Sequence, residues 1–543
     1  MKKIIFNLTG ICCLFLISCN DLEQHPLDRF TDVNFWTSEA KASAVLNQAY
    51  CIMGRYPSST SQIPQYYPII FDMERLTDNI YFAKGTDPSM VVVGAADAYN
   101  QLFSIHWRDC YQGIKACHVF LSNIDRVPMD ANKKERMKAE ARFLRAYQFF
   151  RLTTNFGDIP FFDYEIPLEE SLVIGRTPHA EVVNWVRSEL NSIVSILPTK
   201  QQYAAADNGR ITKGAVMGLL AQTYLHANDW ANVSATCKKI MDGEYGTYNL
   251  LPDYEGVFLP QNQYSTEILL DIAYVDGVRT WDAMRDNIPI SQLGRSSEFA
   301  PTQDLVEDYI MLNGLPIKDP NSGYNEDNPY VNRDPRMNAI VYHGYKWKKP
   351  DGTFVTIEID PLTSTTVDKY VPNNLFSSPT GYYLRKWYDP TARQSDMASG
   401  LNIILIRYAD ILLMYAEAMI EQNQMNEQVW NATIKKLRER AGFTDPNALD
   451  WKASYNQAAL REIVRRERRC ELAFEGTRLY DLRRWKTAEI VLNGRPRGAK
   501  FANNNTEYIL ATPRTFNKNR DYLWPVPGSE RDINPNLGQN PGW

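Results

Sequence analysis

The stretch RRERRCELAFEGTRLYDLRRW contains carboxylates whose spacing could support acid–base chemistry. Glu467, Glu471 and Glu475 recur every four residues, so a helix would place them on one face. Catalysis by paired carboxylates, as in glycoside hydrolysis, needs one member with a raised pKa. Arginines surround all three residues, and neighbouring guanidinium groups lower the pKa of a carboxylate. The pattern therefore favours ion pairs within a scaffold over a catalytic pair.

No other motif indicates a catalytic or metal site. The sequence has no GxSxG, HExxH, P-loop or GxGxxG after a strand, and its histidines never stand at ligand spacing. The cysteines after Cys19 are odd in number and form no CxxC, which argues against a disulfide framework and a zinc site. In one helix Cys110 and Cys117 would lie about 10 Å apart, too far to bridge, so we expect buried free thiols. We predict no enzyme activity, no metal and no cofactor.

One loop leaves calcium binding open as an alternative. In DPNSGYNEDNPY, oxygen-bearing side chains alternate from Asp319 to Asp327, as they do in a calcium-binding loop. The twelfth position holds Tyr330 where such a loop carries a bidentate glutamate. A solvated turn is the preferred interpretation.

The first residues are typical of a secreted protein. Lys2 and Lys3 precede the apolar residues 4–17, a stretch shorter than the roughly twenty residues that span a membrane. Leu-Ile-Ser before Cys19 resembles a bacterial lipobox, in which the cysteine is acylated and becomes the new N-terminus. The alternative is an ordinary signal with an incidental cysteine. We predict a signal peptide at 1–18 and an acylated tether at 19–30, held in the membrane by its acyl chains.

The residues after Cys19 bear on where the protein is anchored. Asp21 and Glu23 resemble the export tag that sends lipoproteins of the Bacteroidetes to the outer face of the outer membrane. We therefore expect a lipid-anchored outer-membrane protein that faces the cell exterior. Loss of Lys2 and Lys3 with the signal takes the formal net charge from −5 to −7, which argues against a nucleic-acid partner.

The rest of the chain reads as two groups of helices separated by a loop-rich region. Apolar residues recur every three to four positions in the helical segments 98–125, 133–156, 178–197, 212–227, 230–242, 408–423, 426–441 and 455–488. Two pairs look alike, Gly218–Gly243 and Ile411–Gly442, and both turn through a segment that contains Asn. Their alternation of large and small residues resembles tetratricopeptide hairpins. We predict a mainly α protein in which such hairpins form a curved scaffold.

The loop-rich region, roughly 244–405, is the predicted ligand lobe. It is rich in Pro, Gly, Asn and Asp. Its connections exceed about fifteen residues, the length beyond which loops are usually functional or disordered. The helical scaffold would comprise mainly 31–243 and 405–490, and 491–543 would form an irregular C-terminal segment. Short strand-like runs in the lobe are EILLDIAYV, AIVYHGY, TFVTIEI and GYYLRKW.

An ordered series of strings resembles the SusD/RagB family of outer-membrane nutrient-binding lipoproteins. The resemblance covers almost the whole of 31–543. It implies tetratricopeptide-like hairpins packed against an irregular lobe, and a SusC-like TonB-dependent transporter over which the lipoprotein sits as a lid. It also implies capture of glycans, or of peptides in the RagB branch, without a catalysed reaction. The strings are NFWTSEAKASAVLNQAY, AEARFLRAYQFFRLTTNFGDIP, RITKGAVMGLLAQTYL, SEFAPTQDLVEDYIMLNGLPI, NRDPRM, IRYADILLMYAEA, RRERRCELAFEGTRLYDLRRW and LWPVPGSERDINPNLGQNPGW.

Two loops offer the residue types that a sugar ligand needs. Sugars stack their C–H faces on aromatic rings, while charged and amide groups bind their hydroxyls. The loop FDMERLTDNIYFAKG supplies Asp78, Asn79, Tyr81 and Phe82 as predicted ligand residues. The loop DIAYVDGVRTWDAMRDN supplies Tyr274, Arg279, Trp281 and Arg285.

The aromatic loops favour a glycan as ligand over a peptide. A peptide would require grooves that bind its backbone, so peptide capture by the same architecture is the first alternative. A surface glycosidase is the second, and it is disfavoured because no carboxylate pair has the setting that raises a pKa.

Overall fold

The computed structural model describes residues 35–54, 68–82, 87–295, 299–372, 374, 376–393, 395, 397–501 and 508–543. The predicted signal peptide, the tether and Cys19 therefore lie outside the described residues. Within these ranges, no helix combines the length and the apolar character that a membrane crossing needs.

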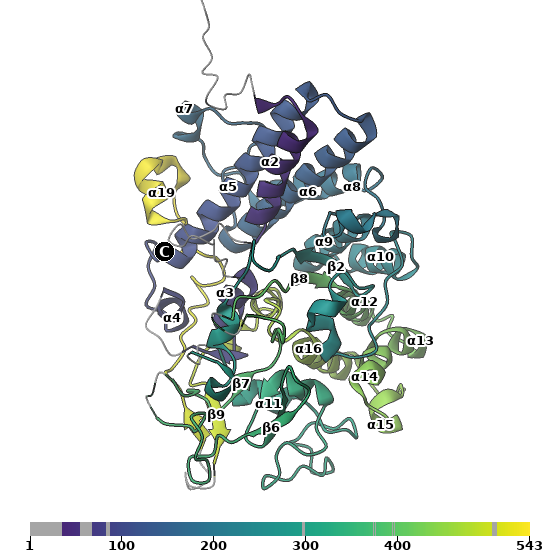
Figure 1. Cartoon of the computed structure of the whole chain (residues 1–543), viewed down its shortest axis with the longest axis vertical. Helices are drawn as coiled ribbons and strands as arrows, with labels where there is room; N and C mark the ends of the chain where they lie inside the picture. Colours follow the sequence, from purple (N-terminus) through teal and green to yellow (C-terminus); the bar gives the residue numbers. More distant parts are fainter. Residues whose placement is uncertain are drawn as a thin grey trace, which may run out of the picture.

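The scaffold is a chain of helices in which each packs against the next. Contacts join α2 to α5, α5 to α6 and α6 to α8, and then α9 to α10, α10 to α12 and α12 to α16. Figure 1 shows the first set at one end of the molecule and the second set beside it. This arrangement confirms the predicted helical architecture. The bounds are α2 (Glu39–Ile52), α5 (Gln101–Asn123), α6 (Ala131–Phe156), α8 (His179–Ile193), α9 (Lys213–His226), α10 (Trp230–Met241), α12 (Tyr408–Glu421) and α16 (Gln457–Leu472).

The two hairpins that look alike in sequence share their turn chemistry. Asn228 after α9 and Asn423 after α12 have φ values of 53° and 56°, in the left-handed region that Asn tolerates better than most residues. The next helix then begins at a side-chain cap, because Asp229 accepts a hydrogen bond from the N–H of Asn232. Asn426 caps the second hairpin in the same way. That hairpin continues as α13 (Glu427–Trp430), a π-helical turn (Asn431–Lys435) and α14 (Lys436–Ala441).

The lobe consists of two-stranded antiparallel pairs joined by long loops. The predicted strand-like runs are confirmed as short strands. The pair β2–β8 links the lobe to the scaffold, since β2 packs against α9 and β8 runs directly into α12. The pairs are β1 (Ile80–Tyr81) with β3 (Ala300–Pro301), β2 (Ile268–Ile272) with β8 (Ile403–Arg407), β4 (Ile340–Val341) with β7 (Tyr383–Leu384), β5 (Tyr345–Lys348) with β6 (Phe354–Ile357), and β9 (Arg497–Lys500) with β10 (Tyr508–Leu510).

The helix predicted over 455–488 is interrupted. Helix α16 ends at Leu472, and α17 (Arg478–Arg484) begins after a turn through Phe474 and Gly476, whose φ values are 67° and 78°. A distant segment of the chain fixes this turn, because the indole N–H of Trp387 donates to the Phe474 carbonyl at 2.8 Å. Glu475 therefore lies beyond the helix that carries Glu467 and Glu471, which corrects the expected single face.

All three carboxylates nevertheless enter one buried network of ion pairs. Glu471 pairs with Arg336 at 2.9 Å, with Arg407 at 2.7 Å and with Arg440. Burial raises the pKa of Glu471, but the guanidinium groups outweigh it and hold that pKa well below its usual range. The other pairs of the network are Glu467 with Arg336 and Arg438, and Glu475 with Arg407 and Lys386. The interpretation as scaffold ion pairs is confirmed.

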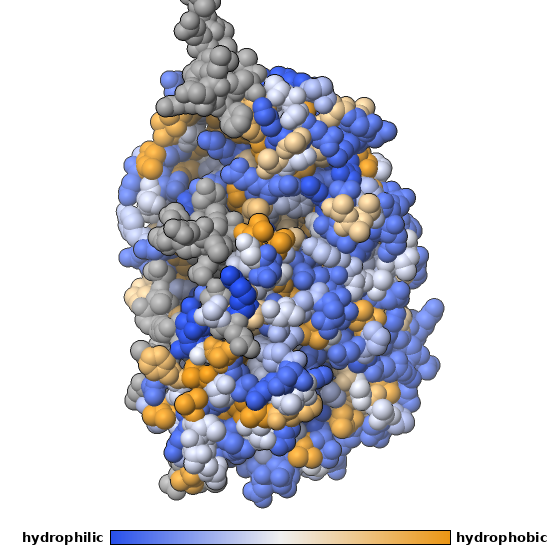
Figure 2. All heavy atoms as spheres, in the orientation of Figure 1, coloured by the Kyte–Doolittle hydropathy of each residue, from blue (hydrophilic) through white to orange (hydrophobic). Residues whose placement is uncertain are grey.

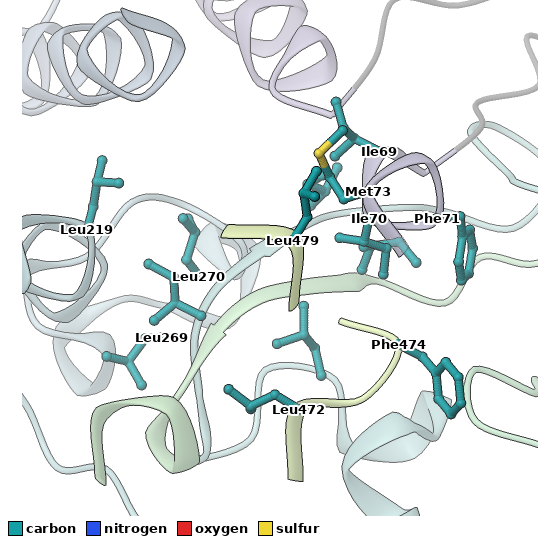
Figure 3. Packing of buried hydrophobic residues seen from close by; sticks show 14 of the residues in the cluster. Ile69, Ile70, Phe71, Met73, Leu219, Leu269, Leu270, Leu472, Phe474 and Leu479 are labelled. Carbon is teal, nitrogen blue, oxygen red and sulfur yellow. The ribbon is translucent and has the colours of Figure 1, made fainter. Parts of the chain in front are cut away.

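Buried apolar side chains of scaffold and lobe form one large cluster. Figure 3 shows Met73 of α3 (Ile69–Arg75) beside Leu479 of α17, with Leu269 and Leu270 of β2 nearer to Leu219 of α9.

Trp281 belongs to this core. Its ring centre lies 5.7 Å from that of Phe71, and the Phe299 ring packs on the other side of Phe71 at 5.1 Å. The indole N–H donates to the Leu401 carbonyl at 2.8 Å, and the side chain is 0% exposed. Stacking of a ligand on Trp281, as predicted from the sequence, does not fit this structure, because the ring has no face open to solvent.

We predict that Glu471→Gln lowers the free energy of unfolding by about 3–5 kcal/mol, because three buried guanidinium groups lose a charged partner. Urea denaturation followed by circular dichroism measures the change. Glu462→Gln, on the exposed side of the same helix, is the matched control and should change stability by less than about 0.5 kcal/mol. Equal effects of the two substitutions would show that the network does not stabilise the fold.

We also predict that Trp281→Ala lowers the free energy of unfolding by about 3–5 kcal/mol, since it leaves a cavity in a fully buried site. Trp281→Phe keeps most of the volume and should cost clearly less. Thermal unfolding of both variants checks the order. If Trp281→Ala proved as stable as the unchanged chain, the assignment of this ring to the core would be wrong.

Candidate functional site

The structure brings the two predicted ligand loops together. Strand β1 ends the first loop and pairs with β3, which follows the second, so that Tyr81 lies opposite Ala300. The Arg75 guanidinium lies over the rings of both Phe82 and Phe299, at 4.4 and 4.6 Å from the ring centres. Residues 299–301 therefore connect the two loops, and we call residues 78–82 and 274–295 together the loop face.

Asp78 and Asn79 are anchors of the first loop. The Asp78 carboxylate pairs with Arg469 at 2.6 Å and with Arg478 at 2.9 Å. Burial raises its pKa, but the two guanidinium groups outweigh burial and lower it. The Asn79 amide donates to Glu74 at 3.1 Å and accepts from Arg469 at 2.9 Å. Both side chains are buried with their hydrogen bonds made inside the protein, so direct contact with a ligand does not fit them.

Tyr81 and Phe82 differ in their access to solvent. Phe82 is buried beneath Arg75, which leaves it no open face for stacking. Tyr81 is half-buried, and its hydroxyl donates to Thr512 at 2.9 Å. A ligand role for Tyr81 stays a prediction.

Tyr274 and Arg279 hold the base of a hairpin tip in the second loop. The Arg279 guanidinium packs over the Tyr274 ring at 4.5 Å and donates to the carbonyls of Ala273 and Cys51, at 2.7 and 2.8 Å. Both residues are buried, so the predicted ligand contacts do not fit them. Their position next to Cys51 ties the hairpin to the end of α2.

The tip that they support is exposed and apolar. Val275 and Arg279 exchange two backbone hydrogen bonds of 2.8 Å, and Gly277 closes the turn with a φ of 73°. Val275 and Val278 project from it and are 54% and 71% exposed. Figure 2 shows other small groups of hydrophobic residues on a largely hydrophilic face of the molecule.

After the tip, ion pairs among charged residues hold the rest of the second loop together. Arg295 pairs with Asp286 at 2.6 Å and with Asp282 at 3.1 Å, and its backbone N–H donates to the Arg285 carbonyl at 2.7 Å. The hydrogen bond to Asp286 and the two negative charges raise the pKa of Arg295. Leu293 is exposed at a φ of 71°, a strained conformation for a side chain of this size.

Arg285 is the predicted ligand residue with unused donors. Its side chain is half-buried, and its guanidinium makes no hydrogen bond or ion pair in the described part of the chain. A guanidinium in this state can donate to hydroxyl or carboxylate oxygens of a ligand.

Sequence reasoning missed Leu293 and Arg295. The alternation of opposite charges at Asp282, Arg285, Asp286 and Arg295 was the available signal for the cluster. Sequence reasoning also missed Asp368. Its carboxylate accepts a hydrogen bond from the backbone N–H of Ser291 at 2.9 Å and so fixes the second loop at Ser291. The sequence gives no sign of that contact, because the two residues lie far apart along the chain.

The other candidate chemistries have structural roles. Asp319 and Asn325 accept hydrogen bonds from the backbone N–H groups two residues on, as expected for solvated turns. Within the described ranges, no cluster of three or more His, Cys, Asp or Glu side chains could hold a metal ion. The five cysteines of these ranges have free thiols, and Cys110, Cys117, Cys237 and Cys470 are buried.

Known proteins with similar sequences are SusD-like. SusD-like protein P2 of Formosa agariphila is 26% identical over the full length of both chains. Starch-binding protein SusD of Bacteroides thetaiotaomicron is 30% identical over 27% of this chain and 26% of its own.

Solved structures agree in fold. A SusD-like carbohydrate-binding protein from Bacteroides fragilis superposes with a TM-score of 0.83 and 29% identity, over 93% of this chain and 99% of its own. A laminarin-binding SusD-like protein superposes with a TM-score of 0.65 and 20% identity, over 94% and 100%. The second likeness concerns the fold alone.

Two family models match successive parts of the sequence. A model described as starch-binding and associating with the outer membrane matches residues 27–225. The model of the SusD family matches residues 266–543, which is more than half of the chain. The resemblance seen in the sequence is thus confirmed, and the protein belongs to the SusD family.

Proposed function

We propose that this protein captures a glycan on its loop face and delivers it to a SusC-like TonB-dependent transporter. A lipid on Cys19 would anchor the protein in the outer membrane, facing the cell exterior. Family membership supports this role, as do the starch-binding relative, the carbohydrate-binding structure from Bacteroides fragilis and the association of a matching family model with the outer membrane.

The proposal is carried by two features of the second loop, the free guanidinium of Arg285 and the exposed apolar tip at Val275 and Val278. The free guanidinium supplies donors for hydroxyl oxygens, and Val275 and Val278 supply an apolar surface for the C–H face of a sugar ring. Asp282 and Asp286 hold the loop through Arg295, so that Arg285 is presented on an ordered backbone. Capture therefore requires no reaction, and the ion-paired Glu467, Glu471 and Glu475 serve the fold.

Peptide capture is the second candidate, and one observation favours it. The burial of Trp281 and Tyr274 removes the aromatic platforms that distinguished a glycan site from a peptide site. An aliphatic tip and a free guanidinium on the same loop also suit a peptide with apolar and acidic side chains.

We predict that Cys19→Ala releases the protein from membranes, because acyl chains would be its attachment. Fractionation of cells followed by immunoblotting measures the distribution. The unchanged chain should be found in the outer-membrane fraction, and the variant in the soluble fraction. If the variant still partitioned into detergent as a lipidated protein, the lipobox assignment would be wrong.

We predict that Arg285→Ala weakens glycan binding by about ten- to a hundredfold, the effect of losing hydrogen bonds from a charged group. Calorimetry of residues 20–543 with polysaccharides, oligosaccharides and peptide mixtures provides the measurement. Arg126→Ala, an exposed arginine on the scaffold, is the matched control and should bind as the unchanged chain does.

The same titrations separate the alternatives. Binding of peptides alone would replace the glycan proposal with the peptide one. Glycan binding that is unaffected by Arg285→Ala would move the site away from the loop face. Release of shorter sugars after long incubation, detected by chromatography, would overturn the proposal of a binding protein without catalysis.

A further inference from the structure

A cavity at the junction of lobe and scaffold shares no residue with the loop face. Its volume is about 150 Å³, many times the roughly 10–15 Å³ that one water molecule requires. Four segments far apart in sequence line it, namely 253–259, 335–339, 385–388 and 440–441. The cavity opens to solvent beside Asp253, Glu255 and Asn338, which are exposed.

The walls of this junction cavity are mostly aromatic. Tyr254, Phe258, Trp387 and Tyr388 all line it. Lys386 lies 4.2 Å from the centre of the Phe258 ring, and its ammonium donates to Tyr254, to Glu475 and to the Ala473 carbonyl. The three donors of Lys386 are therefore used within the protein, and they hold the aromatic wall in place.

Two arginines that line the junction cavity carry buried nitrogens with no hydrogen-bond partner among the described residues. The side chain of Arg385 is 8% exposed and lies over Trp347 and Tyr388, at 4.3 and 4.6 Å from the ring centres. Its Nε donates to Glu255 at 2.9 Å, while its Nη1 has no partner. Arg440 uses its terminal nitrogens for Glu267 and Glu471, and its Nε is left without a partner. Buried donors of this kind are costly to leave unpaired.

The backbone beside the junction cavity is strained. Trp387 has a φ of 70° and Phe474 a φ of 67°, in a region that bulky residues rarely adopt. The hydrogen bond from the Trp387 indole N–H to the Phe474 carbonyl holds both residues in place. Strain that the surroundings maintain is characteristic of ligand sites.

We propose that the junction cavity binds one saccharide ring, neutral or uronic, as a second sugar site. Acceptor oxygens of the ring would take the free donors of Arg385 and Arg440, and its apolar face would lie against the aromatic wall. The carboxylates of Asp253 and Glu255 at the opening would accept hydrogen bonds from its hydroxyl groups. The choice of a saccharide rests on the proposed function, but the site is separate from the loop face.

Saturation-transfer NMR of residues 20–543 with glucose, galactose, xylose and glucuronate tests this proposal. We expect transfer to at least one sugar, and binding at least tenfold weaker in Asn338→Trp, which fills the opening with an indole. Asn191→Trp, an exposed asparagine on α8, is the matched control and should bind normally. Arg385→Lys keeps the charge but removes Nη1, and it should also weaken binding. This variant provides the test if Asn338→Trp fails to fold.

The outcomes distinguish the two sites. No transfer to any sugar in the unchanged chain would overturn the second site and leave a cavity filled with water. Transfer that survives both Asn338→Trp and Arg385→Lys would also overturn it. Monosaccharide binding that is lost in Arg285→Ala but not in Asn338→Trp would assign the signal to the loop face. Monosaccharide binding that needs Asn338, in a chain that binds no longer glycan, would support this site and contradict the proposed function.

Discussion

The desolvated charges around α16 are the constraint on which the rest of the structure depends. Glu471 meets guanidinium groups from three separate parts of the chain: Arg336 of the lobe, Arg407 at the end of β8 and Arg440 of α14. A buried ion that lacks its partner is far more costly than the pair is favourable. Scaffold and lobe must therefore be in their final positions together before all of these charges are compensated.

The same constraint determines which parts of the loops can meet a ligand. Arg469 of α16 holds Asp78 and Asn79, and the contact of Trp281 with Phe71 holds the second loop against α3. Most polar and aromatic residues of the loops are therefore used to fasten them. The residues of the loops that are exposed or half-buried lie beyond these anchors, and they include Val275, Val278, Arg285 and Leu293.

Much of the fold was readable from the sequence, because helices and hairpins depend on local signals. Apolar periodicity located the long helices of the scaffold, namely α5, α6, α8, α9, α10 and α12. The turns through Asn228 and Asn423 follow from what that residue tolerates. The break after α16 was not readable, since Phe474 is held in its conformation by Trp387 from a distant segment. The burial of several predicted ligand residues was not readable for a related reason. The type of a loop residue does not reveal its burial, and Trp281 suits a core as well as it suits a sugar.

The burial of Cys110, Cys117, Cys237 and Cys470 has a chemical consequence. Burial raises the pKa of Cys110 to about 11 and that of Cys117 to about 12, and it raises the pKa of Cys237 and Cys470 as well. At neutral pH almost none of these sulfurs is a thiolate, the form that attacks disulfides and is oxidised. Close packing therefore lowers the reactivity of these four thiols toward oxidants and disulfides.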